Sequence, residues 1–177
     1  DFDFTKMDLV ALMKLDYVDL ATEVLSTFVP EDGKELIHEA CKNAYGKGLF
    51  PKNVVPVKKA GDVFVAELFH GQTAAFKDMA LSLLPYLMTL SLKQLNEQRE
   101  VMILAATSGD TGKAALEGFK DVPGTCIKVF YPLDGVSMIQ QQQMVSQTGN
   151  NVKVIGIHGN FDDAQTAVKK AFGSQEL

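Results

Sequence analysis

The sequence has 177 residues, of which 46% are hydrophobic and 22% are charged, and its formal net charge is −5 at pH 7. This composition is typical of a globular protein of one domain or slightly more, and the dispersed lysines argue against nucleic-acid binding. The longest apolar run, 79–92, is shorter than the roughly 20 residues that a bilayer requires, so we expect no membrane span. Two cysteines far apart and no clustered histidines indicate neither a disulfide framework nor a metal site, which favours a cytoplasmic location.

The first part of the chain has two helical segments followed by a hairpin. Apolar residues recur at helical spacing over 19–28 and 35–45, which predicts two helices. The segments 54–58 and 63–69 are predicted to be strands joined by a tight turn. We therefore expect residues 1–75 to form an N-terminal helical segment plus a β-hairpin, as part of a larger domain.

A long helix is predicted over 76–97, with a kink at Pro85, because a proline inside a helix removes one backbone hydrogen bond. Strand and helix then alternate three times, a pattern typical of a parallel sheet flanked by helices. The predicted strands are 101–106, 126–131 and 152–157, and the predicted helices are 113–119, one that starts at Ser137, and 161–172. The predicted fold class is thus α/β with three layers, and residues 76–177 should form its βαβαβα domain.

The segment 107–112, Thr-Ser-Gly-Asp-Thr-Gly, lies between a predicted buried strand and a predicted helix. In parallel sheets this is where anions bind, because the amides of a helix N-terminus are exposed at the carboxyl end of a strand. The glycines allow the backbone to approach a ligand, and the Ser and Thr residues add hydroxyl groups. The spacing fits neither a P-loop nor a dinucleotide fingerprint, so a small carboxylate or phosphate is the candidate ligand. A tight turn with a Ser or Thr cap is the equally weighted alternative.

Lys77 begins the predicted helix 76–97 and follows a run of small residues. The helix dipole disfavours an ammonium at this position, and a neutral amine is the form that makes an imine with a carbonyl. The alternative is an ordinary solvated lysine that pairs with its neighbour Asp78. His70, beside Gly71, is expected to be a loop residue bonded to the backbone rather than an acid or base. Residue chemistry alone thus leaves two possible sites and no substrate.

The segment 67–78, Glu-Leu-Phe-His-Gly-Gln-Thr-Ala-Ala-Phe-Lys-Asp, resembles the lysine signature of the threonine synthases, usually met as E-x-F-H-G-P-T-x-x-F-K-D. The segment 105–112, Ala-Ala-Thr-Ser-Gly-Asp-Thr-Gly, resembles the second signature of the same family. Two separate signatures in the same order make the match specific. Gln72 stands where the family usually has proline, which loosens the turn before Lys77 but removes no reactive group.

The resemblance implies a fold-type II enzyme that depends on pyridoxal 5'-phosphate, in which Lys77 forms the internal imine and moves protons between substrate carbons. The substrate's α-carboxylate would bind to Thr107, Ser108, Gly109, Asp110 and Thr111. Asp110 would also bind the cofactor, near its phenolic oxygen. The implied reaction is the conversion of O-phospho-L-homoserine and water to L-threonine and phosphate through imine intermediates.

Members of this family are considerably longer than 177 residues, and the glycine-rich loop that grips the cofactor phosphate lies further along their chains. We therefore expect a fragment that lacks the C-terminal part, is inactive by itself, and binds the cofactor weakly or not at all. Two alternatives stay open. One is a threonine-synthase-like phospho-lyase that releases phosphate without making threonine, and the other is a non-catalytic anion-binding module on the same fold.

Overall fold

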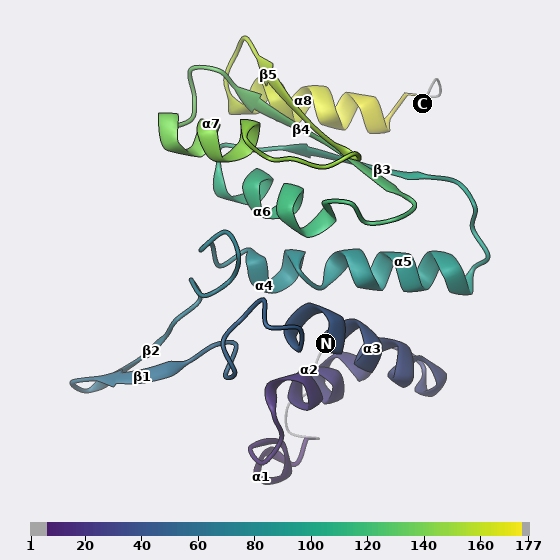
Figure 1. Cartoon of the computed structure of the whole chain (residues 1–177), viewed down its shortest axis with the longest axis vertical. Coiled ribbons are helices and arrows are strands. Elements are labelled where there is room, and N and C mark those ends of the chain that lie inside the picture. The colour runs from purple at the N-terminus through teal and green to yellow at the C-terminus, as the bar shows by residue number, and fades with distance from the viewer. Residues whose placement is uncertain (1–6, 175–177) are drawn as a thin grey trace.

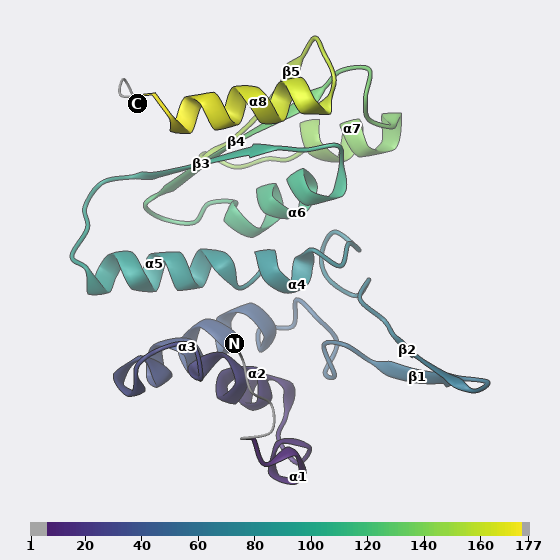
Figure 2. The ribbon, with the colours of Figure 1, turned by 180° about the vertical axis from the view of Figure 1, so that it is seen from behind.

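The computed structural model describes residues 7–174. Two short helices, α4 (Asp78–Leu81) and α5 (Leu84–Gln94), run through the middle of the molecule (Figure 1). The N-terminal helices and a hairpin lie on one side of them, and a three-stranded parallel sheet with its own helices lies on the other. Figure 2 shows the same division from behind.

The N-terminal group consists of α1 (Leu9–Leu12), α2 (Tyr17–Ser26), the 3₁₀ turn η2 (Glu31–Gly33) and α3 (Lys34–Tyr45). The predicted helices 19–28 and 35–45 correspond to α2 and α3. One face of α3 is fully buried, because Ala40, Cys41 and Ala44 recur at helical spacing and are 0% exposed. The core around them also takes in Leu83, so this group packs against the central helices.

The hairpin pairs β1 (Val57–Ala60) with β2 (Val63–Ala66) in antiparallel register, and its residues are exposed. It projects away from the body in both views (Figures 1 and 2). The predicted strands, 54–58 and 63–69, are displaced from these bounds. Pro56 has no backbone N–H, and its carbonyl oxygen accepts the N–H of Glu67 at 2.9 Å, where the regular ladder stops.

The prediction of one kinked helix over 76–97 is wrong, because α4 and α5 are separate helices. Pro85 is the second residue of α5 and has no N–H to donate to the carbonyl oxygen of Leu81. That oxygen instead faces Gly118 of α6, where any Cβ would overlap it. The proline therefore ends α4 and allows it to pack closely on α6.

The sheet has the order β3-β4-β5 and all its strands are parallel. Its strands are β3 (Val101–Ala106), β4 (Thr125–Pro132) and β5 (Val152–Ile157), and its helices are α6 (Asp110–Phe119), α7 (Met138–Val145) and α8 (Phe161–Phe172). The helix α8 covers one face, and α6 lies against the other (Figure 1). Leu116, Phe119, Ile127 and Val129 form the centre of this core. The predicted α/β class, with a parallel sheet flanked by helices, N-terminal helices and a small hairpin, is confirmed.

The two cores share the central helix α5, which contributes Leu87 to the first and Met88 to the second. The division of the chain at residues 75 and 76 stays a prediction. Within residues 7–174, no helix is long and apolar enough to cross a membrane. The same part of the chain has no group of three or more His, Cys, Asp or Glu side chains that could hold a metal ion.

Candidate active site

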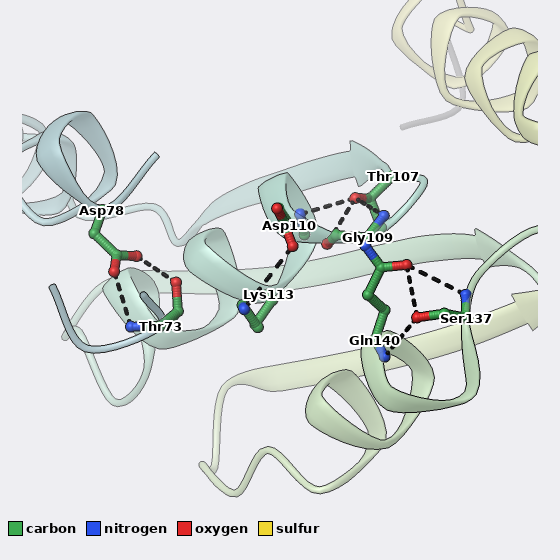
Figure 3. Close-up of polar contacts among 9 residues, drawn as sticks. Thr73, Asp78, Thr107, Gly109, Asp110, Lys113, Ser137 and Gln140 are labelled. Carbon is green, nitrogen blue, oxygen red and sulfur yellow. Dashed lines mark hydrogen bonds and ion pairs between the residues drawn. The ribbon is translucent and has the colours of Figure 1, made fainter. Parts of the chain in front are cut away.

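Two loops carry the residues singled out from the sequence, and the packing of α4 on α6 brings them to one region. One loop joins β3 to α6, and the other leads into α4 at Lys77. Figure 3 shows Lys113 of α6 between Asp110 on one side and the pair Thr73 and Asp78 on the other. The fold thus places the two signatures near each other, although α5 separates them in the sequence.

Thr107 supports the first loop from inside. It is 1% exposed, and its hydroxyl oxygen accepts the N–H groups of Gly109 at 3.0 Å and Gly112 at 2.9 Å. The same hydroxyl lies 3.2 Å from the carbonyl oxygen of Gly109, to which it donates. Gly109 has φ +148°, a conformation that favours glycine. The structure therefore places the Thr107 hydroxyl on the inner side of the loop.

The outer side of this loop presents unused backbone donors. Among residues 7–174, the N–H groups of Ser108, Asp110 and Thr111 have no hydrogen-bond partner, and these residues are exposed. The hydroxyls of Ser108 and Thr111 are also without a partner in the described chain. The N-cap residue of α6, Gly109, has no side chain to cap the helix, which starts at Asp110, three residues before the predicted start. We call these three N–H groups the anion cradle, because unpaired amides at a helix N-terminus attract negative charge.

Asp110 brings a carboxylate to the edge of the anion cradle. Its Oδ1 lies 3.9 Å from the ammonium nitrogen of Lys113, one turn further along α6. The side chain of Lys113 is 10% exposed and that of Asp110 is 55% exposed, so the lysine is the buried partner. Sequence reasoning missed Lys113 as part of the site, because a lysine inside a helix carries no motif.

Asp78 closes the second loop. This carboxylate is 4% exposed and accepts two hydrogen bonds from Thr73, one from its N–H at 2.8 Å and one from its hydroxyl at 2.5 Å (Figure 3). A Cβ at Gly71 would overlap the Asp78 carboxylate, so the turn requires glycine there. The alternative that Asp78 pairs with Lys77 is not realised, because the carboxylate binds back onto the preceding turn.

Lys77 is consequently left without a carboxylate. Its ammonium nitrogen lies 4.8 Å from the ring centroid of Phe76, and in the described part of the chain it has no ion pair or hydrogen bond. Lys77 is the N-cap of α4, which has only four residues. Because so short a helix has a weak dipole, the predicted effect of the dipole on the ammonium is small. An amine that is half-buried and unpaired suits a cofactor with a reactive carbonyl, and the residues present fit pyridoxal phosphate in this respect.

Glu67 joins the hairpin to the Lys77 loop. Its carboxylate accepts from Lys58 at 2.7 Å and from Nε2 of His70 at 2.7 Å, although Glu67 itself is only 9% exposed. These hydrogen bonds, Lys58 first and then His70, hold the pKa of Glu67 below its ordinary value. The prediction that His70 bonds to the backbone is wrong, because its ring binds the Glu67 carboxylate. Glu67 and His70 are three residues apart within the lysine signature, which names both residues but not their contact.

The larger cavities lie away from both loops. One of about 720 Å³ is lined by residues of α2 and of the segment 46–54, and one of about 690 Å³ lies beside the end of α5 and the turn 120–124. Neither includes Lys77 or the anion cradle. Ser108, Asp110 and Thr111 are exposed and Lys77 is half-buried, so the two loops form an open face.

Comparison with known proteins gives the class and then the family. No family model matches the chain. The structure superposes on a pyridoxal-phosphate-bound threonine synthase from Brucella melitensis with a TM-score of 0.82 and 38% identity, over 96% of this chain and 37% of that one. For the yeast threonine synthase the TM-score is 0.84 and the identity 30%, over 99% of this chain and 37% of that one. The fold and the two loops thus define an α/β protein of the pyridoxal-phosphate fold type II.

Sequence similarity identifies the family within this class. The threonine synthase of Pseudomonas aeruginosa is 38% identical over 179 residues, which cover 97% of this chain and 36% of that protein. The chain belongs to the threonine synthase family, a family of lyases. It spans somewhat more than a third of the length of this relative.

Proposed function

We propose that this chain is part of a threonine synthase that converts O-phospho-L-homoserine and water to L-threonine and phosphate. The observation that carries the proposal is the unpaired Lys77 amine and the anion cradle on one open face, in a chain that is 38% identical to a threonine synthase. The amine suits covalent attachment of a carbonyl cofactor, and the cradle suits a carboxylate.

Each residue has a defined task in this proposal. Lys77 holds pyridoxal phosphate and later carries a proton on its side-chain nitrogen. The segment 107–111 holds the substrate's α-carboxylate, with the Thr107 hydroxyl supporting the cradle from beneath. Asp110 would bind the cofactor, near its phenolic oxygen. The cofactor, when bound, supplies an electron sink for carbanions.

We propose in addition that the 177-residue chain alone is catalytically inert and largely free of cofactor. The open face supports this, because an enclosed site excludes water and strengthens electrostatic contacts. Reduction with borohydride in the presence of pyridoxal phosphate, followed by peptide mass mapping, should leave Lys77 mostly unlabelled. Stoichiometric labelling of Lys77 in this chain would contradict the proposal. A cytoplasmic location is also proposed, consistent with two free cysteines.

The function is tested by product analysis with the full-length protein and O-phosphohomoserine. We expect threonine and phosphate in equal amounts, and the loss of both in Lys77→Ala. The matched control is Lys59→Ala, which removes an exposed lysine of the hairpin. Phosphate without threonine would indicate the phospho-lyase, and unchanged function of Lys77→Ala would indicate a non-catalytic module.

A further inference from the structure

Gln140 lies at the start of α7, where it forms a capping box with Ser137. The backbone N–H of Gln140 donates to the Ser137 hydroxyl at 3.3 Å. In return, Oε1 of Gln140 accepts from the Ser137 N–H at 3.2 Å and from its hydroxyl at 3.0 Å. Because two donors point at Oε1, the orientation of the carboxamide is fixed, and its nitrogen faces away from Ser137.

The nitrogen of this carboxamide lies against Gly109, which stands between Ser108 and Asp110 of the anion cradle. Figure 3 shows the Gln140 side chain reaching from α7 to Gly109, with Nε2 at the loop. A Cβ at Gly109 would overlap Nε2 and would lie 2.6 Å from the carboxamide carbon. The Gln140 carboxamide is therefore in direct contact with Gly109. Among the residues that the structure describes, Nε2 has no hydrogen-bond partner.

Two further N–H bonds are therefore available beside the three amides of the cradle. A carboxylate has two oxygens and about four lone-pair directions, more than the three amides of the cradle satisfy. Hydrogen bonds to an ionised group are shorter and stronger than those between neutral groups. We propose that Gln140 is a substrate-binding residue whose side-chain nitrogen donates to the substrate's α-carboxylate. This inference rests on the proposed function and extends its site to α7.

The competing explanation is that Gln140 serves only to cap α7. A substitution that keeps the cap but removes the donor distinguishes capping from substrate binding. Glutamate and glutamine serve equally at this position of a capping box, because each offers an oxygen to the Ser137 N–H. Gln140→Glu therefore keeps the cap. It also replaces the donor at the cradle with a carboxylate oxygen, which repels a bound anion.

The test uses the full-length protein carrying Lys77→Ala, so that the substrate binds without turnover. Calorimetric titration with O-phosphohomoserine should show binding weakened about tenfold or more by Gln140→Glu. The matched control is Gln143→Glu, which adds the same charge at an exposed position of the same helix and should bind like the parent. With Lys77 intact, Gln140→Glu should raise KM more than it lowers kcat.

The possible outcomes distinguish substrate binding by Gln140 from helix capping and from failure of the proposed function. Equal affinity of Gln140→Glu and Gln143→Glu would overturn the assignment of Gln140. Ser137→Ala breaks the box but keeps the carboxamide, so an affinity loss as large as that of Gln140→Glu would assign the effect to capping and would also overturn it. Absence of O-phosphohomoserine turnover in the full-length protein with Lys77 intact would instead contradict the proposed function, and this inference with it.

Discussion

The two loops of the site share one design and differ in one chemical detail. In each, a buried side chain binds the backbone of the turn from inside and leaves the reactive groups outside. In the loop after β3 the buried group is the Thr107 hydroxyl, which accepts two N–H groups. In the loop before α4 it is the Asp78 carboxylate, which accepts two hydrogen bonds from Thr73.

The Thr107 hydroxyl is neutral and the Asp78 carboxylate is charged, and this difference matches the groups that the two loops expose. A buried carboxylate beneath the cradle would repel an incoming anion through a region of low dielectric. A neutral hydroxyl avoids this and leaves the amides of Ser108, Asp110 and Thr111 unpaired. The loop of Lys77 presents an amine and no anion site, so a buried carboxylate there carries no such penalty.

The largest effect on stability is expected for Thr107→Val. Valine has nearly the same shape but cannot accept the N–H groups of Gly109 and Gly112, which are then buried without partners. We expect a loss of about 3 kcal/mol, from roughly 1–3 kcal/mol for each unsatisfied donor. Urea unfolding of the 177-residue chain measures it. Ser108→Ala, at an exposed position, should stay within about 0.5 kcal/mol, and similar losses in the two variants would contradict the role of Thr107.

A somewhat smaller effect is expected for Asp78→Asn. Asparagine offers one oxygen to Thr73 and turns its NH₂ group towards the second donor, so one charge-assisted bond is lost. The expected destabilisation is about 2 kcal/mol, measured in the same way. Combined with Thr73→Val, the losses should be less than additive, because both changes remove one contact. Additive losses would show that Asp78 does not act through Thr73. The exposed Asp62→Asn is the control.

The smallest effect concerns Glu67 and depends on pH. Its folded pKa is lowered by Lys58 and His70, so the ionised carboxylate stabilises the fold at neutral pH. This stability is present above the ordinary carboxyl pKa and is lost as the pH falls through the lowered value. The thermal midpoint of the native chain should therefore exceed that of Glu67→Gln at pH 7 and approach it in acid.

The control for this pH series is Glu39→Gln, an exposed carboxylate of α3. Its difference from the native chain should stay small from pH 7 down to acid. A gap between native and Glu67→Gln that persists at low pH would show that the effect of Glu67 is steric rather than electrostatic.

Elements with strong local signals were predictable from the sequence. The helix 161–172 has the predicted bounds, and α7 begins at Met138, one residue after the predicted start, with Ser137 as its N-cap. Both agree because capping residues and periodicity act within one turn. The sheet followed from unbroken apolar runs. The break at Pro85 and the early start of α6 were not predicted. In α6, the residues Asp-Thr-Gly resemble a turn locally, and the Thr107 hydroxyl of the preceding loop satisfies the amide of Gly112.

The site was predictable only as two short segments. The signatures located Lys77 and the segment 107–111, but not which way each side chain faces. That the Thr107 hydroxyl points inward, that Asp78 binds Thr73, and that the carboxamide of Gln140 meets Gly109 depend on how loops pack. The residues of the first two contacts lie within the signatures, which record the residue types but not their hydrogen bonds. The contact between Gln140 and Gly109 joins separate segments, so no motif records it.

The central claim is that the amine of Lys77 holds the cofactor in the complete protein. Borohydride reduction of the full-length protein with bound pyridoxal phosphate, followed by peptide mass mapping, tests it directly. We predict one stoichiometric label, on the peptide that contains Lys77. A label on another lysine, or none under conditions where the protein makes threonine, would contradict the account.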